Sequence, residues 1–159
     1  MSQAKLSTPS ETSGDTFVSG YLLYLLAASS QQASEQFHAH VRARGLRVPE
    51  WRVMACLVDN DGMMITRLAR LSLLEQSRMT RIVDQMDARG LVTRAADARD
   101  KRRVRVRLTP KGRALAEELV GEARRHEARL LSALADTDAA RIRKVLQTLL
   151  DVLDAPGEI

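Results

Sequence analysis

The sequence predicts a mainly α-helical protein with a small β wing of two to three strands, and three observations support this fold class. Apolar residues recur at helical spacing through most of the 159 residues, and the period changes from 3.6 to 2 only between residues 91 and 108. Aromatic residues are only 3% of the chain, so aliphatic side chains must build the core, which disfavours an all-β sandwich. With 45% hydrophobic and 28% charged residues, the chain is able to fold as one domain.

The N-terminal part is expected to be a tail followed by two helices. Residues 1–15 are polar and are predicted to form a flexible tail. Residues 17–44 are predicted to form one long helix, which Gly45 ends. Pro49 suits the first turn of a second helix that runs to Asn60.

A short helix and a longer one follow. The turn at residues 59–62 leads to a short extended piece at 63–65, and Thr66 is predicted as the N-cap of a short third helix. The fourth helix is predicted to begin near Glu75 and to end at Arg89, with Gly90 at the C′ position.

The change of period predicts a hairpin and then two more helices. Strands are expected at residues 91–94 and 104–108, the second with one apolar and one cationic face, around a polar tip at 97–103. Thr109 and Pro110 predict the start of a fifth helix, which breaks at 135–137 before a sixth begins near Asp138.

Positive charge is concentrated in one third of the chain. The formal net charge is +5 and the pI is about 10. Residues 66–113 hold 14 Lys and Arg against 5 Asp and Glu, so this stretch alone carries +9 while the rest carries −4. A basic balance that is this localised indicates a polyanionic partner, most often a nucleic acid.

The element order from residue 49 to residue 110 is that of a winged helix-turn-helix. A helix fits the DNA major groove, where base edges carry a distinct pattern of donors and acceptors. We expect DNA contacts from the fourth helix and from the hairpin tip, through Gln76, Ser77, Arg78, Thr80, Arg81, Arg99, Asp100, Lys101, Arg102 and Arg103. The basic groups Arg99, Lys101, Arg102, Arg103 and Arg105 lie on one hairpin, so they are expected to repel each other and to require an anion. Arg89 and Arg94 are instead expected to pair with nearby acids such as Asp87 or Asp97.

Residues 68–115 resemble the DNA-binding core of the MarR family, the multiple-antibiotic-resistance regulators. Three features carry the resemblance: the TR-x₃-D-x₅-GLV-x-R string at 80–94, the D-x-R wing tip at 100–102 and the LTPKG junction at 108–112. The sequence departs from the family in the turn between the third and fourth helices. Ser72, Leu73 and Leu74 stand there, where the family often has glycine.

The resemblance implies a homodimer that binds a double-stranded, pseudo-palindromic DNA operator. Residues 16–159 would then form a single domain after the tail, with dimerisation helices at 16–46 and 111–155 and the DNA-binding lobe at 49–110. The apolar stripes of the first, fifth and sixth helices agree with a dimer, because they are wider than so small a lobe can bury. The resemblance also implies that Asp100 orients Arg102 toward the minor groove.

The family resemblance implies a small effector as well, commonly an anionic phenolic or aromatic compound. Candidate ligand-binding residues are Tyr21, Tyr24, His40, Trp51 and Arg52, with His38 nearby. An arginine beside Trp51 suits a carboxylate, although Tyr21 and Trp51 are equally well explained as core residues and Arg52 as a solvated one. We expect binding of the effector to change the spacing of the two recognition helices and so to release a repressor, which requires a coupling of only a few kcal/mol.

Cysteine and histidine give no sign of a redox or metal centre. Cys56 is the single cysteine and sits in the apolar stretch VMACLV, which favours a buried structural thiol. His38 and His40 point to different helix faces, and His126 continues a core-facing spacing that suits a dimer interface. We therefore expect no metal and no cofactor.

Three functional hypotheses follow, and the first is preferred. The chain is expected to be a cytoplasmic, ligand-responsive DNA-binding regulator, most simply a repressor that responds to an aromatic, phenolic or acyl-coenzyme A ligand. The alternative within DNA binding is a ligand-independent or redox-gated regulator that uses Cys56. An enzyme or a protein-interaction module is the most distant hypothesis, because no catalytic motif is present. The sequence has no run of about 18 apolar residues, so no membrane association is expected.

Overall fold

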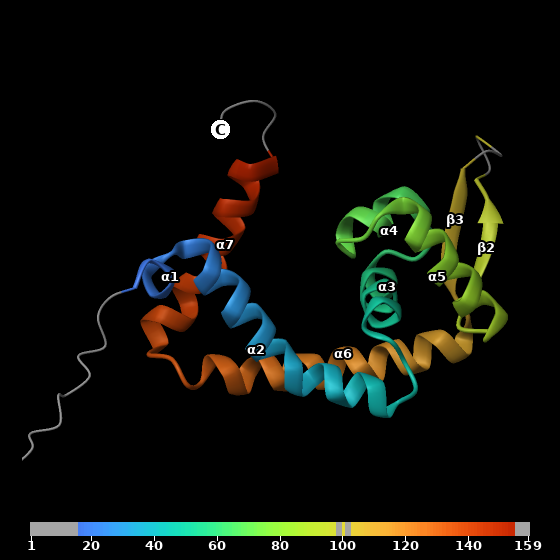
Figure 1. Cartoon of the computed structure of the whole chain (residues 1–159). Coiled ribbons are helices and arrows are strands. Elements are labelled where there is room, and N and C mark those ends of the chain that lie inside the picture. The colour runs from blue at the N-terminus through green and yellow to red at the C-terminus, as the bar shows by residue number, and fades with distance from the viewer. Residues whose placement is uncertain (1–15, 98–99, 101–102, 155–159) are drawn as a thin grey trace, which may run out of the picture. The chain divides into compact units, whose positions relative to one another are not determined.

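The computed structural model describes residues 16–97, 100 and 103–154, and the chain divides into two compact units, residues 1–35 and 36–159. The predicted tail, residues 1–15, lies outside the described residues. In the first unit, α1 (Phe17–Gly20) is followed by α2 (Leu22–Ala43) (Figure 1). Tyr21, whose backbone is extended, separates the two helices. The prediction of one uninterrupted helix was therefore wrong at this point, where Gly20 weakens the helix.

The second unit contains the end of α2 and all the remaining elements. These are α3 (Val48–Asp59), β1 (Met63–Met64), α4 (Ile65–Leu71), α5 (Gln76–Ala88), β2 (Val92–Ala96), β3 (Val104–Leu108), α6 (Pro110–Leu131) and α7 (Asp136–Asp154). The mainly helical fold with a three-stranded wing confirms the predicted fold class. No helix within the described ranges combines the length and the apolarity needed to cross a membrane.

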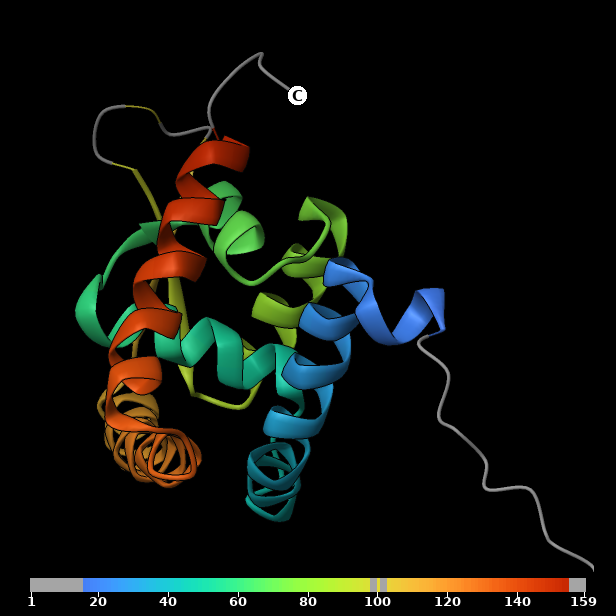
Figure 2. The ribbon, with the colours of Figure 1, turned by 90° about the vertical axis from the view of Figure 1, so that its left-hand side faces the viewer.

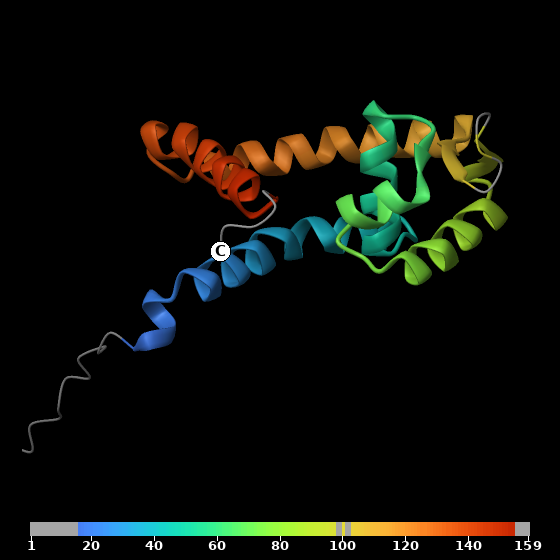
Figure 3. The same cartoon turned by 90° about the horizontal axis from the view of Figure 1, so that it is seen from above.

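The three strands form one small antiparallel sheet in the order β1-β3-β2. Met63 pairs with Val106 in β3, and Val92 pairs with Leu108 at the far end of the β2–β3 hairpin. Figure 3 places the hairpin beside α5, at the end of the unit where α6 begins. The sheet therefore joins the turn that follows α3 to the strands that carry the wing.

Backbone caps decide where the helices end. Gly45 and Gly90 both have positive φ, and in each case the amide of the next residue bonds back to a carbonyl five residues earlier. This motif commits the amide of Leu91 to Met86 O, so β2 begins at Val92 and not at the predicted Leu91. At α6 the prediction is confirmed, because the Thr109 side chain accepts a hydrogen bond from the Gly112 amide and Pro110 is the first helical residue.

Two helix starts differ from the prediction. Helix α4 begins at Ile65, and Met64, not Thr66, is its N-cap, without a side-chain hydrogen bond. Ile65 is buried, and its packing in the core favours a helix that begins before the predicted N-cap. Helix α7 begins at Asp136, two residues before the predicted position.

The core of the second unit lies between α3, α4, α5, the sheet and the first half of α6. Figure 2 looks along α6 and shows α3 beside it. The largest apolar side chains that are fully buried are Val41, Val53, Met54, Leu57, Leu68, Met79, Val83, Met86, Leu119, Val92 and Val106. Aliphatic residues and methionines thus form this core, as the shortage of aromatic residues predicts.

Candidate nucleic-acid interface

Helix α5 has one buried apolar face and one exposed polar face. Met79, Ile82, Val83 and Met86 pack into the core. On the other side, the side chains of Gln76, Ser77, Arg78 and Arg81 are exposed. Within the described ranges no carboxylate pairs with Arg78 or Arg81, so both guanidinium groups remain available to an anion.

Thr80 is in a different position from its neighbours on α5. Its side chain is half-buried, and its hydroxyl donates to Gln76 O at 3.1 Å. The hydroxyl oxygen keeps its acceptor capacity, while its single donor is already used within the helix.

The base of the wing is held by a buried carboxylate. Asp97 is almost fully buried, and it accepts hydrogen bonds from the Arg105 side chain and, at 3.1 Å, from the Asp100 amide. Arg105 also donates to Gly62 O at 2.8 Å, which ties β3 to the turn before β1. The expectation that Arg105 needs an outside anion was therefore wrong, because Asp97 already compensates its charge.

The wing tip is only partly described. Arg99, Lys101 and Arg102 lie outside the described residues, and so does the predicted orientation of Arg102 by Asp100. In the described part, Asp100 forms an ion pair with Arg103 at 3.3 Å. Arg103 is exposed and also reaches Met64 Sδ at 4.0 Å, so its side chain lies across the gap between the wing and β1.

A groove of about 540 Å³ lies between the start of α5 and the wing. Its lining residues come from β1, α4, α5 and both wing strands, and they are Met64, Ile65, Thr66, Gln76, Thr80, Arg94, Arg103 and Val104. Thr66 and Arg94 were not among the predicted DNA-contact residues. The strand period placed Arg94 on the hairpin, but nothing local indicated that it borders α5.

Arg89 and Arg94 both pair with acids, as expected, but their partners are not Asp87 or Asp97. Arg94 pairs with Asp84 on α5, and Arg89 pairs with Glu50 on α3 at 3.0 Å. The predicted partner Asp97 is occupied by Arg105. Asp87 lies two positions before Arg89 on α5, and residues at this spacing do not face each other on a helix.

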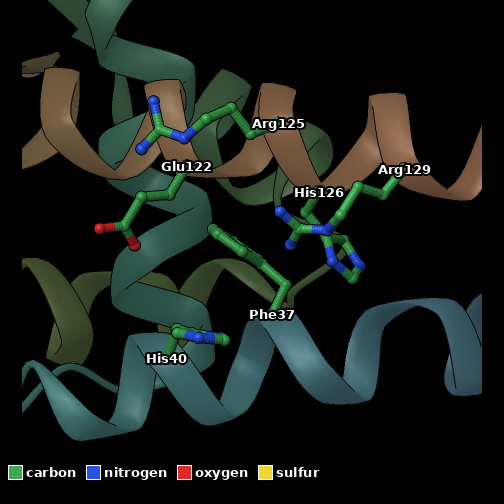
Figure 4. Close-up of a pocket in the computed structure, with 6 residues that line it drawn as sticks. All are labelled: Phe37, His40, Glu122, Arg125, His126 and Arg129. Carbon is green, nitrogen blue, oxygen red and sulfur yellow. The ribbon is translucent and has the colours of Figure 1, made fainter.

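A second cavity, of about 190 Å³, lies between the C-terminal half of α2 and α6 (Figure 4). It is lined by Phe37, His40, Glu122, Arg125, His126 and Arg129. The Glu122 carboxylate is bound by Arg44 at 2.5 Å. In the part of the chain that the structure describes, no carboxylate pairs with Arg125 or Arg129, so the charge of the cavity is positive.

The predicted ligand-binding residues have different surroundings in the structure. His40 lines the cavity, and Trp51 packs edge-on against Phe37 with 5.1 Å between ring centroids. Arg52 donates to Ser72 O at 3.1 Å, at the end of α4. Tyr21 and Tyr24 belong to the first unit, where both are exposed.

Four of the cavity residues were missed by the sequence analysis. They are Phe37 on α2 and Glu122, Arg125 and Arg129 on α6, none of which was among the predicted ligand-binding residues. His126 was noted as core-facing, and its ring does lie 5.9 Å from that of Phe37. The spacing of His126 and Arg129 on one helix face was the only local signal.

The thiol and the histidines show no reactive geometry. Cys56 is half-buried, and burial raises the pKa of its thiol, which disfavours the reactive thiolate. His40 Nδ1 bonds with Gln36 O at 2.8 Å. Among the described residues, no three His, Cys, Asp or Glu side chains gather at a metal site.

Comparison with known proteins agrees with this geometry. The sequence profile of the MarR family matches residues 46–104. The chain is 82% identical to the MarR family transcriptional regulator SPO1453 of Silicibacter pomeroyi DSS-3, whose crystal structure matches with a TM-score of 0.81 over 88% of this chain and 100% of that one. It is 28% identical over 130 residues to the HTH-type transcriptional repressor Rv2887 of Mycobacterium tuberculosis, which is 82% of this chain and 91% of the repressor.

A third similar protein has a known effector. The structure of BpsR from Bordetella bronchiseptica, whose DNA binding is regulated by 6-hydroxynicotinic acid, matches with a TM-score of 0.75 at 25% identity, over 87% of this chain and 99% of that one. Members of the family are DNA-binding regulators and not enzymes. With the helix-turn-helix, the wing and the 82% identity to SPO1453 in agreement, the chain belongs to the MarR family of winged helix-turn-helix transcriptional regulators.

Proposed function

We propose that this regulator is a repressor that binds a pseudo-palindromic operator as a homodimer and leaves it when a small anionic aromatic acid binds. Helix α5 enters the major groove, and the wing reaches the adjacent minor groove. The observation that carries the DNA contact is the exposed face of α5, where Arg78 and Arg81 stand without a carboxylate partner in the described ranges. Arginine in this setting binds phosphate or reads guanine with two hydrogen bonds.

The groove beside α5 supports a contact with the DNA backbone. Thr66 and Gln76 offer a hydroxyl and an amide, and Arg94 and Arg103 offer cations on the opposite wall. Both cations are compensated in the free protein, by Asp84 and Asp100 respectively. A phosphate between these walls would compete with the two carboxylates, so this groove contributes orientation more than net attraction.

The exposed apolar residues of α7 support a homodimer, in which a second copy of the chain buries them. Val145 is 62% exposed, and the apolar residues Ile142, Leu146, Leu150, Val152 and Leu153 are also exposed. So wide an apolar stripe is unusual on the surface of a monomer and is typical of an interface. A dimer with two-fold symmetry places its two recognition helices at half-sites one helical turn apart, 34–36 Å.

The cavity between α2 and α6 supports an anionic effector with a single ring. Arg125 and Arg129 are available to a carboxylate, while Phe37 and His126 offer ring faces. Its volume of about 190 Å³ is below the range of about 300–1,000 Å³ for drug-sized ligands. This favours a compound such as the 6-hydroxynicotinic acid of BpsR over an acyl-coenzyme A thioester, whose bulk would remain outside.

No observation favours the alternative of a regulator gated by oxidation of Cys56. Burial raises the pKa of this thiol, and peroxide reacts with thiolates. The ligand-responsive repressor therefore remains the proposal.

DNA binding is tested by selection from sheared genomic DNA of the source organism, at moderate salt with competitor DNA. We expect the protein to enrich a palindromic site, and we expect Arg78→Ala to lose the enrichment. Arg124→Ala is the matched control, because it removes one exposed arginine from α6, away from the interface. Uniform retention that disappears with salt would contradict specific recognition.

The effector is tested by thermal unfolding with 6-hydroxynicotinic acid and salicylate. We expect at least one of them to raise Tm and to release the enriched DNA, because a ligand that binds only the folded state stabilises it. Arg129→Ala should weaken binding about tenfold, while Arg124→Ala should leave it unchanged. An equal response of both variants would exclude the cavity as the site.

A further inference from the structure

Glu50 is a charged residue in the interior of the second unit. It lies in the first turn of α3 and is 0% exposed. Its Oε1 accepts hydrogen bonds from Arg47 and from Arg89, both at 3.0 Å, and its Oε2 accepts from the Arg47 amide at 2.7 Å. A carboxylate this deeply buried is retained only with such partners.

The two arginines extend this contact to the recognition helix. Arg89 is the C-cap of α5, and its other nitrogen donates to Gly45 O at 2.9 Å, in the turn that ends α2. Arg47 also donates to Gln85 on α5. Lys111, in the first turn of α6, donates to Arg89 O at 3.2 Å. The start of α3 and the end of α5 therefore meet at the Glu50 carboxylate, and Arg89 connects the end of α2 and the start of α6 to them.

Apolar packing alone does not fix the direction in which α5 points. Met79, Ile82, Val83 and Met86 hold one face of the helix, but apolar contact is not directional. Hydrogen bonds of Arg89 to Glu50 and to Gly45 O set the direction of the helix end, because their strength depends on angle. The exposed residues that face DNA stand at the opposite end of the same helix.

We propose that Glu50 is a positioning residue for DNA recognition, which holds the C-terminal end of α5 through Arg89 and so sets the orientation of the recognition helix. This inference rests on the proposed role of α5 in the major groove. Glu50 does not touch DNA, so its loss should reduce discrimination between sequences more than general attraction to DNA. Arg89 also connects α5 to the turn that ends α2, and α2 forms one wall of the cavity proposed for the effector.

The first test compares affinities for two probes, a DNA fragment that the wild-type protein has enriched and poly(dI-dC). Glu50→Gln and Arg89→Lys should each weaken binding to the enriched fragment about tenfold and binding to poly(dI-dC) less than about twofold. Arg89→Lys is included because the Arg89 side chain is 44% exposed and lysine keeps the positive charge, so we expect this variant to fold even if Glu50→Gln does not. The matched control is Asp61→Asn, which breaks an ion pair with Arg113 at 3.1 Å that does not involve α5.

The second test needs no DNA and separates this inference from the proposed function. Hydrogen–deuterium exchange should become faster in the variants at the amides of Arg89, Gly90 and Leu91, which close the end of α5. If the wild-type protein enriches no DNA, the proposed function fails, while this exchange result still decides whether Glu50 holds the helix end. Unchanged exchange at these amides, or an equal loss of affinity for both probes, would overturn the positioning role.

Discussion

The conformation of single residues determines how the helix-turn-helix is closed. Leu73 has a φ of +56° in the turn between α4 and α5 and is 79% exposed. Its amide bonds to Arg70 O and the Leu74 amide bonds to Ala69 O, which is the same cap that Gly45 and Gly90 form elsewhere. A side chain in this left-handed conformation costs about 1–2 kcal/mol.

Leu73→Gly should therefore stabilise the protein. The relief of backbone strain outweighs the greater entropy of glycine in the unfolded chain, for a gain of about 0.5–1 kcal/mol in the free energy of unfolding. Urea denaturation measures it, with Leu73→Ala as the control that removes the same exposed side chain but keeps the strain. Equal stability of the two variants would show that the exposed leucine side chain, and not the strained backbone, lowers the free energy of unfolding at this position.

At Gly112 the constraint is close packing against a neighbouring backbone, and here glycine is the residue that fits. A Cβ at this position would lie 1.8 Å from the carbonyl oxygen of Leu91, so the start of α6 would have to move. Gly112→Ala should destabilise the protein by about 3 kcal/mol or more. Gly121→Ala, on the same helix, has room beside the Arg125 side chain and should add about 0.5–1 kcal/mol. Thermal unfolding of the pair tests this, and a stable Gly112→Ala would contradict the close packing.

Glu50 should make stability depend on acid pH. Burial alone would raise the pKa of its carboxyl, but the hydrogen bonds and charges of Arg47 and Arg89 outweigh burial and hold the pKa below the usual 4.5. Its contribution is therefore fully present above pH 4.5 and is lost as the pH falls through the lower folded pKa. Urea denaturation from neutral to acid pH should show that the difference in the free energy of unfolding between wild type and Glu50→Gln decreases as the pH falls through this window. If this difference in the free energy of unfolding does not change with pH, Glu50 is not stabilised as a carboxylate by the two arginines.

At the scale of elements, α5 and the wing are expected to contribute to DNA binding in different ways. Arg78 projects from the exposed face of the recognition helix, whereas Arg103 lies at the base of the wing beside the groove. A base contact carries sequence information, while a phosphate contact mainly carries salt dependence.

Substitution should separate these two roles. Arg103→Ala should weaken binding to all sequences modestly and reduce the slope of log K against log[salt] by less than about 0.9, because Asp100 already compensates part of the charge of Arg103. Arg78→Ala should relax the preference for the enriched site over a site with one changed base pair. Fluorescence anisotropy at several salt concentrations measures both effects. If the two variants change the salt dependence and the base-pair preference equally, α5 and the wing do not have different roles in DNA binding.

At the scale of the whole molecule, the proposed homodimer requires an exposed apolar face, and α7 has one. Val145 stands on the apolar stripe of α7, and Gln147 stands on its polar side, where it bonds with Asp151 at 3.2 Å. Val145→Asp should shift the protein from dimer to monomer, because a carboxylate in an apolar interface loses its hydration. Gln147→Asp should not. Light scattering after gel filtration distinguishes them, and a Val145→Asp variant that remains dimeric would place the interface elsewhere.

The sequence predicted well what local chemistry determines. Gly90 and the Thr109-Pro110 pair marked the end of α5 and the start of α6, because a cap depends on a few adjacent residues. The alternation in β3 and the buried face of α5 were likewise visible as periods. Packing over longer distances changed the rest, as at Ile65, whose burial moved the start of α4.

The parts of the site that depend on distant residues could not be predicted. Glu50 and Arg89 are 39 positions apart, and no local pattern joins them. Phe37 and Arg129 line one cavity only because α2 and α6 lie side by side there. Asp97 was one of the acids expected to pair with Arg89 or Arg94, but it pairs with Arg105 on β3 instead.

The most direct test of the account is a footprint of the protein on the DNA fragment that it enriches. We predict protection that is symmetric about a centre, with two major-groove contacts about 10 base pairs apart, as a dimer with two recognition helices requires. An anionic aromatic acid that raises Tm should abolish this footprint. An unsymmetric footprint over one half-site, or diffuse protection that salt removes, would contradict the dimeric, operator-specific repressor.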